Sequence, residues 1–183
     1  MLHAVIQAGE SFQNPRTGTR LEVRESTPDR VVFDRRYPPG TGHADPHVHF
    51  DITQSREVLS GQASGDVDGE TREVKAGQTV EIPTGVPHQD IHNPHTGDLS
   101  VRWTVAPVND FVEAFADCYT HYLTRDELNK QDEFTALQLF PILHATRAQS
   151  WIARVPIPVQ KLMIPIGAWL GRLRGYRPRY DET

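Results

Sequence analysis

Up to about Val105 the chain alternates short stretches of apolar and polar residues with turns rich in Gly, Pro and Asp. Such stretches occur at residues 21–26, 29–37, 56–67, 71–77, 78–83, 89–94 and 99–107. No stretch of about 15 residues in this part keeps a helical period, and the Gly and Pro residues would interrupt one. The pattern therefore predicts an all-β domain whose antiparallel strands close into a sandwich or a barrel.

The pattern changes after Pro107. Apolar residues recur at helical spacing over residues 110–123, which predicts a helix. The sequence Thr-Arg-Asp-Glu at 124–127 has the spacing of a capping box, so a further helical turn is expected to open there and the chain to be helical from this point. Residues 134–149 are another predicted helix, which Pro141 should end or kink.

Residues 151–176 form an amphipathic and basic segment. On a helical wheel the polar face is narrow and carries Arg154, Lys161 and Arg172. The broad apolar face comprises Trp151, Val155, Val159, Leu162, Met163, Ile166, Trp169, Leu170 and Leu173. Prolines interrupt the segment, and its longest uncharged stretch is shorter than the ~20 residues of a membrane span. We expect this face to pack on the barrel or on a second subunit, in preference to a membrane surface.

The chain has 183 residues, of which 37% are hydrophobic and 23% charged, as in a soluble globular protein. This length suits one domain and an appendage, here a β-barrel at residues 1–106 and a helical C-terminal extension at residues 107–183. The formal net charge of −5 is uneven, because residues 134–183 hold seven basic and two acidic side chains and residues 1–133 therefore carry −10. The acidic body argues against nucleic acid as a partner, whereas the basic tail suits an anionic surface.

The N-terminal residues and the single cysteine indicate the compartment and limit the chemistry. Residues 1–12 lack the basic and long apolar regions of a secretory signal, so a cytoplasmic protein is expected. Cys118 is the only cysteine, which excludes an intrachain disulfide and a thiolate-rich zinc site. We expect it to be a small apolar filler on a helix.

Candidate chemistry is concentrated between residues 38 and 95. His47 and His49 are two residues apart, so on a strand both imidazoles point to the same face. Two imidazoles on one face can share a metal ion, and a third His from a neighbouring strand would complete the set. Neutral imidazole nitrogens suit zinc, copper, iron and nickel. This part of the chain therefore predicts a mononuclear metal site.

The residues around these histidines resemble the two motifs of the cupin superfamily. The second motif, G(X)5PXG(X)2H, is matched without a gap at residues 77–88. The first motif is matched by the His-Val-His sequence at 47–49 and by its ending, Glu-Val-Leu-Ser-Gly, at 57–61. The resemblance implies a mainly β fold, the double-stranded β-helix or jelly-roll barrel of cupins, to which the α-helical C-terminal extension is attached.

The resemblance also implies a ligand set. Many cupins place a metal-binding Glu after the first motif's histidines, and the same count here gives the ligands His47, His49, Gln54 and His88. An amide thus replaces the usual carboxylate and makes the site less suited to hard divalent ions. Glu57 is the rival candidate for this ligand. It lies three residues after Gln54, so on a strand its side chain should point to the opposite face, outward. The expected cofactor is a divalent transition metal, namely iron, manganese, nickel or zinc, and an empty site is the alternative.

Other polar residues near the motifs are candidates for supporting roles. Imidazoles that hold a metal usually donate their second N–H to an acceptor. Asp45, Asp51 and Asp90 are near enough in sequence to accept it, although each is also an ordinary turn or loop aspartate. Arg56 lies two residues after Gln54 and should also point into the barrel. There it would either orient an acidic substrate in the catalytic site or, without that role, form an internal salt bridge or extend to the barrel mouth.

Three further histidines, His43, His92 and His95, lie close to the ligands in sequence, and each is expected to be exposed. The sequence shows no phosphate loop, no nucleophile with a placed base and no dinucleotide fingerprint.

Resemblance to cupins leaves more than one function open, because this fold supports dioxygenation, isomerisation, decarboxylation and plain ligand binding. One hypothesis is a metal-dependent enzyme, a dioxygenase-like oxidoreductase or an isomerase, acting on a small acidic molecule. Another is a non-catalytic binding or sensing module whose basic helical tail mediates dimerisation or membrane-surface contact. In a third, the tail is purely structural and is swapped onto the barrel of a second subunit in a homodimer.

Overall fold

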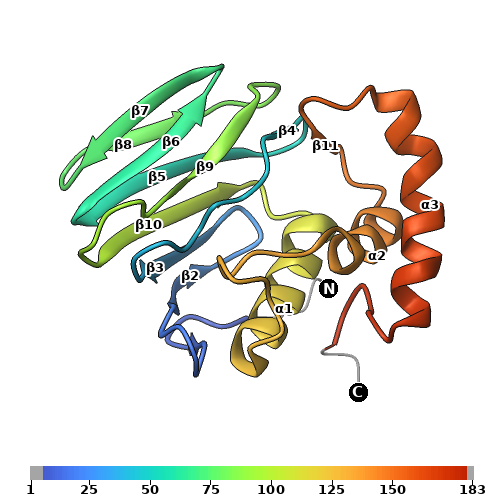
Figure 1. Ribbon diagram of the computed structural model, residues 1–183, viewed down its shortest axis with the longest axis horizontal. Coiled ribbons are helices and arrows are strands. Elements are labelled where there is room, and N and C mark those ends of the chain that lie inside the picture. The colour runs from blue at the N-terminus through green and yellow to red at the C-terminus, as the bar shows by residue number, and fades with distance from the viewer. Residues whose placement is uncertain (1–5, 181–183) are drawn as a thin grey trace.

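A computed structural model of the chain describes residues 6–180. Two antiparallel β-sheets make up one part of the molecule, and three helices lie beside them (Figure 1). The predicted fold class, a mainly β jelly-roll barrel with a helical C-terminal part, is confirmed. The first five residues, which belong to the segment judged to lack a secretory signal, and the last three residues lie outside the described part.

Both sheets are built from strands that are distant in sequence. The first sheet has the order β1 (Ser11–Gln13), β2 (Arg20–Ser26), β3 (Val31–Tyr37), β10 (Leu99–Ala106), β5 (Thr53–Ser60) and β8 (Thr79–Ile82). The second sheet has the order β11 (Ser150–Ile152), β4 (His47–His49), β9 (His88–His92), β6 (Gln62–Val67) and β7 (Glu70–Lys75). The chain crosses between the sheets from β4 to β5 and from β8 to β9. Residues of both motifs therefore come to line one shared interior.

Alternation along β10 shows how the interior is filled. Leu99, Val101, Trp103 and Val105 are buried, and each residue between them is only half-buried. A strand with one face on a core has this period of two. These inward residues belong to two apolar clusters, one inside the barrel and one where the first sheet meets the helices.

The first helix, α1 (Asp110–Arg125), begins at a polar cap. The Asn109 side chain accepts a hydrogen bond from the backbone N–H of Val112 at 3.0 Å, which satisfies one of the unpaired donors of the first turn. The buried side of α1 shares one core with residues of β2, β3 and α2 (Ala136–Thr146), so the extension is packed onto the barrel. Cys118 is fully buried on α1, as predicted.

The helical turn expected to begin at Thr124 is not formed. The Thr124 hydroxyl donates to the carbonyl of Thr120 at 2.9 Å within α1, so it does not cap a new helix. Asp126 then ends α1 in the left-handed conformation, with φ of 55°, and the chain runs as a loop to α2. The capping box is found instead at Thr135 and Gln138, where α2 begins.

Pro141 lies inside α2 and does not end it. A proline cannot donate to the carbonyl four residues before it, which here is that of Leu137. The third helix, α3 (Ile157–Leu173), packs closely against this segment. A Cβ atom on Gly171 would lie 2.5 Å from the Leu137 oxygen, and one on Gly167 would lie 2.0 Å from the ring of Phe140. The two glycines therefore allow the close approach of α3 to α2.

Replacing Gly171 with alanine is expected to lower the free energy of unfolding by about 1–3 kcal/mol, because the new methyl group meets a backbone carbonyl that cannot rotate away. The better helix propensity of alanine offsets up to about 1 kcal/mol of this loss. Urea unfolding measures the difference. Gly97 is the matched control, since a Cβ atom there meets nothing within 4 Å. Equal stabilities of the two variants would contradict the close helix contact.

The C-terminal extension is joined to the barrel at two further places. Strand β11, which the sequence pattern did not predict, pairs antiparallel with β4 and sets Trp151 opposite Val48. In the loop before α2, the buried Asp132 carboxylate accepts hydrogen bonds from Asn14 and Thr19 near the N-terminus. Residues beyond 106 thus contribute a strand to the second sheet, next to the strand that carries two of the predicted ligands.

The apolar face predicted for residues 151–176 does not pack on the barrel. Trp151 is buried in β11, but the members of that face within α3 are exposed. The buried residues of α3 are on its opposite side, namely Gln160, Ile164, Gly167, Ala168 and Gly171. Within residues 6–180, no helix is long and apolar enough to cross a membrane.

Candidate metal centre

Three histidines from two neighbouring strands come together inside the barrel. His47 and His49 lie on β4, and His88 at the start of β9 is the antiparallel partner of His47. One nitrogen atom from each of the three rings lies within 4.8 Å of the others. This is the arrangement that the two-residue spacing and the motif predicted, because neighbouring antiparallel strands place paired residues side by side.

Hydrogen bonds of the ring nitrogens orient two of these imidazoles. The Nδ1–H of His47 donates to the Asp45 carbonyl at 2.7 Å, and the Nδ1–H of His88 donates to the Val86 carbonyl at 3.0 Å. When such a ring is neutral, its free lone pair lies on Nε2. The Nε2 atom of His88 and the Nδ1 atom of His49 are buried and have no hydrogen-bond partner. Buried lone pairs without a donor, next to rings fixed by carbonyl acceptors, fit a metal ion.

The protonation state of the histidines also suits a metal. Burial, reinforced by the neighbouring His47 and His88, lowers the pKa of His49 well below its ordinary value. Burial likewise lowers the pKa of His88 to about 4. Both rings are consequently neutral at pH 7, which is the form that binds transition metals.

Gln54 faces the interior, as the alternation of side chains along the strand predicted. Along β5 the buried residues are Gln54, Arg56 and Val58, whereas Glu57 is half-buried on the other side of the strand. The Gln54 side-chain oxygen accepts a hydrogen bond from Nη2 of Arg56. An amide oxygen in this position can accept one further interaction, so the prediction of Gln54 as the fourth ligand stays open.

Arg56 forms the internal salt bridge that was one of its two predicted roles. Its side chain is completely buried, its Nη2 atom lies 2.8 Å from Oδ1 of Asp90, and its guanidinium stacks 3.6 Å from the ring centroid of Trp103. Arg56 also donates to the Ser55 carbonyl at 3.1 Å. With no exposed surface and its charge paired, the guanidinium holds Asp90 and Gln54 in place, and its role toward an acidic molecule stays a prediction.

Asp90 connects this ion pair to the histidines. Its Oδ2 atom lies 3.7 Å from Nε2 of His47. Although burial opposes ionisation, the adjacent Arg56 holds the pKa of Asp90 well below its usual range, so the carboxylate is charged. Of the other two aspartates considered, Asp45 contributes only its backbone carbonyl, and the side chain of Asp51 accepts from Asn109 at 3.1 Å.

The remaining histidines near the motifs do not join this cluster. His43 and His92 contact each other, with ring centroids 4.7 Å apart, and His95 lies 3.3 Å from Glu73 at the surface. His43 and His95 are exposed as predicted, whereas His92 is half-buried.

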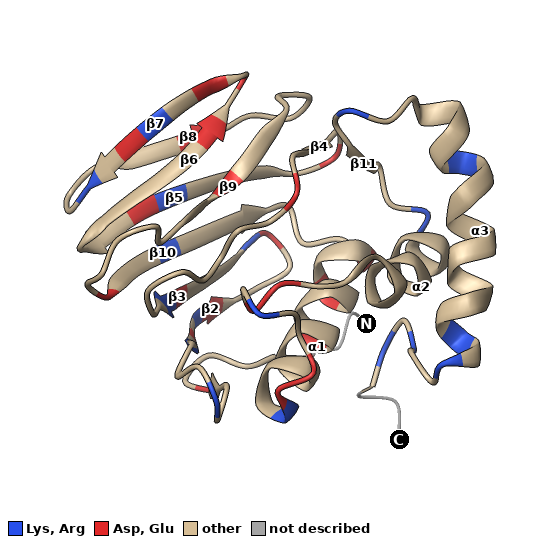
Figure 2. Ribbon diagram, in the orientation of Figure 1, with Lys and Arg blue, Asp and Glu red and all other residues tan. Residues whose placement is uncertain are grey.

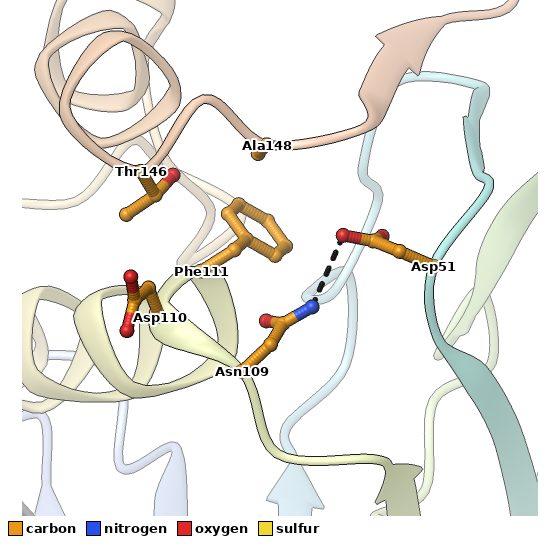
Figure 3. A pocket seen from close by; sticks show the side chains of 6 residues that line it. All are labelled: Asp51, Asn109, Asp110, Phe111, Thr146 and Ala148. Carbon is orange, nitrogen blue, oxygen red and sulfur yellow. Dashed lines mark hydrogen bonds between the residues drawn. The ribbon is translucent and has the colours of Figure 1, made fainter. Parts of the chain in front are cut away.

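A cavity of about 340 Å³ lies next to the cluster, between the barrel and the helices (Figure 3). It is lined by Asp51, Asn109, Asp110, Phe111, Thr146 and Ala148. The Phe111 ring is 5.8 Å from that of His49, centroid to centroid. Sequence reasoning missed this cavity, because its walls come from three segments that only the packed extension brings together.

The comparisons with known proteins agree with this geometry. The profile of the cupin domain matches residues 33–105. Residues 33–105 therefore form a cupin domain. None of the curated proteins matches the chain.

Several solved structures are similar to part of the chain. KdgF from Halomonas sp. is 22% identical, with a TM-score of 0.48 and coverage of 57% of this chain and 93% of that protein. A predicted oxalate decarboxylase from Thermotoga maritima is 19% identical, with a TM-score of 0.46 and coverage of 59% and 99%. An RmlC-like cupin from Shewanella frigidimarina is 18% identical, with a TM-score of 0.43 and coverage of 53% and 83%. These similarities concern the fold alone.

Proposed function

We propose that this cupin binds one divalent transition metal ion, iron, manganese, nickel or zinc, and acts on a small organic molecule at that ion. The observation that carries the proposal is the histidine cluster, in which two ring nitrogens are buried without a hydrogen-bond partner. His47, His49 and His88 would hold the metal, with Gln54 as a weaker fourth ligand. A metal bound there supplies Lewis acidity and, if it is iron or manganese, redox chemistry of the dioxygenase type.

The residues around the histidine cluster have different roles in this proposal. Arg56 positions the amide oxygen of Gln54, and the Asp45 carbonyl orients the ring of His47. Trp103 and Tyr37 carry a buried indole N–H and a buried hydroxyl with no hydrogen-bond partner among the described residues. Both residues belong to the apolar cluster inside the barrel. Arg56 is retained as the residue that would orient an acidic substrate.

Metal content tests the first half of the proposal. Protein purified without added metal is analysed for its elements, and the chelator-treated protein is then titrated with Fe²⁺, Mn²⁺, Ni²⁺ and Zn²⁺. We expect one ion to bind per chain. If no metal binds, the proposed function is wrong.

Turnover separates an enzyme from the alternative, a binding or sensing module. Small carboxylic acids are screened against the metal-loaded protein by NMR, which reports binding and conversion in the same sample. Conversion that ends on chelation supports the enzyme. Binding without conversion supports the sensing module, which the exposed face of α3 independently favours by offering a contact for a second component.

The replacement Gln54→Glu is expected to raise the affinity for Mn²⁺ about tenfold, equivalent to about 1.4 kcal/mol, because a carboxylate is a better ligand for a hard ion than an amide. Competitive titration against a fluorescent chelator measures this affinity. Glu57→Gln is the control, since Glu57 lies on the same strand with the opposite orientation and should leave the affinity unchanged. An unchanged Mn²⁺ affinity in Gln54→Glu would remove residue 54 from the ligand set.

A further inference from the structure

Helix α3 has a broad apolar face that nothing in the described part of the chain covers. The exposed fractions are 69% for Leu162, 60% for Trp169 and 67% for Leu173. Large apolar residues exposed on this face are Val159, Leu162, Met163, Ile166, Trp169, Leu170 and Leu173. The opposite side of α3 is buried and includes one large apolar residue, Ile164, so most of the large apolar residues of α3 face outward. Contiguous apolar surface of this kind marks an interaction site.

The charge around this face has a single sign. Between residues 147 and 180 the chain contains no Asp or Glu. Lys161 and Arg172 lie along one edge of the apolar face, and Arg154 and Arg174 lie beyond the two ends of α3. Figure 2 shows α3 and its flanking loops with basic residues only, whereas acidic residues are spread over the sheets. The residues that surround the apolar face therefore attract an anionic partner.

The location of α3 suits a broad, flat partner. The helix runs along the outer edge of the molecule, on the side of α2 that faces away from α1 (Figure 1). Its apolar face is the convex surface of a helix and not a groove, so it can be inserted but cannot enclose a ligand. Long basic side chains beside such a face can reach headgroups while their methylene groups stay in the apolar layer.

We propose that α3 docks this protein on a membrane surface that contains anionic lipids, with the helix lying in the interfacial plane. Insertion of the apolar face into the headgroup boundary and attraction of the basic edge to anionic headgroups are the two features of an interfacial amphipathic helix. Trp169 on this face is the residue type enriched at that boundary. The docking site is separate from the histidine cluster and does not depend on the proposed metal.

A second copy of the chain fits the face less well. Outside α3, the large apolar residues exposed within residues 6–180 are only Phe50 and Ile152, so another copy offers no second apolar patch for this face. A symmetric dimer would have to pair α3 with α3. In the antiparallel arrangement that a two-fold axis favours, Lys161 of one copy approaches Arg172 of the other, and like charges at close range oppose the contact.

Vesicle flotation of the full chain tests the proposal. The probes are vesicles of phosphatidylcholine alone and vesicles in which about a third of the lipid is phosphatidylglycerol. We expect the protein to float with the anionic vesicles and to be released by high salt. The triple variant Leu162→Gln, Ile166→Gln, Leu173→Gln should bind at least about tenfold more weakly. All three side chains are exposed, so circular dichroism and thermal unfolding should show a folded protein.

Tryptophan fluorescence gives an independent measurement on the same samples. Trp103 and Trp151 are 7% and 8% exposed, and Trp169 is 60% exposed, so a blue shift on vesicle addition reports the burial of Trp169. Trp169→Phe should abolish the shift and keep flotation. Phe50→Gln is the matched control, because it removes an exposed apolar side chain outside α3 and should leave both signals unchanged.

Two results would overturn membrane docking. One is a wild-type protein that does not float, or a triple variant that floats as well as the wild type. The other is a dimer, seen by light scattering, that dissociates in the triple variant while neither protein binds vesicles. That second result would assign the face to a second copy of the chain.

Discussion

Replacing His88 with alanine is expected to lower the affinity for a transition metal about a hundredfold, as judged by titration of the chelator-treated protein. Sites with four protein ligands bind zinc with about 10–16 kcal/mol, so one ligand of four accounts for about 3 kcal/mol. His88 supplies one of the two buried nitrogens that have no hydrogen-bond partner, and no other ring lies where it could replace it. His47→Ala should show a similar loss, and because its side chain is partly exposed, this variant disturbs the core less.

His95→Ala is the control for a general effect of removing histidines. His95 lies at the surface beside Glu73 and outside the cluster, so its replacement should leave metal affinity unchanged. A His88→Ala protein that binds metal as tightly as the wild type would show that the three rings are not the site.

Much of this cluster could be predicted from spacing. A two-residue separation puts His47 and His49 on one face of a strand, and the second motif supplies His88 from a strand that the fold places alongside. The alternation of side chains along β5 correctly predicted that Gln54 faces inward and Glu57 faces outward. The alternation along one strand shows which side chains face inward, however, and it does not show which residues of other strands they contact.

The partner of Arg56 illustrates that limit. Asp90 follows His88 by two residues on β9, so the same rule would have placed it inside the barrel, near the ligands. Whether it meets Arg56 depends on how far apart the two sheets lie at this point, which no local pattern records. The contact forms the internal salt bridge that was one alternative for Arg56, and the role of Arg56 toward a substrate stays a prediction.

In the fold, the strands up to residue 106 were predictable because each buries one face on a core and shows a period of two. The structure of the C-terminal part was harder to predict from the sequence. Strand β11 is three residues long, too short for a period, and exists because β4 offers an unpaired edge. Helix α2 continues through Pro141, and α3 packs against this segment at Gly171.

The wheel of the last helix identified the residues that share the apolar face, but this face does not pack on the barrel, which was one of its two expected partners. Periodicity shows which residues share a face, but either face of a helix can be the buried one. Gly167 and Gly171 allow the backbones of α2 and α3 to approach, and that contact buries the side of α3 on which the two glycines lie. The apolar residues were left outside, so hydrophobicity alone would have oriented α3 incorrectly.

Replacing Asp90 with asparagine is expected to lower the free energy of unfolding of the metal-free protein by about 3–5 kcal/mol. Arg56 has no exposed surface, and Asp90 is its only anionic partner among the described residues. Without the carboxylate, a guanidinium charge remains buried and uncompensated. Urea unfolding in the presence of a chelator measures the loss without any contribution from metal binding.

Two comparisons identify the buried charge as the cause. Asp98→Asn breaks the pair between Asp98 and Arg36, whose side chains are both about half exposed, and should cost at most about 1 kcal/mol. Combining Asp90→Asn with Arg56→Met removes both buried charges and should recover most of the lost stability, because a buried ion pair adds little over apolar packing. If Asp90→Asn costs no more than Asp98→Asn, the Arg56 charge is not confined as the structure shows. If the double variant is as unstable as Asp90→Asn, the loss comes from Asp90's own contacts, and the part of Arg56 in holding the site together would have to be abandoned.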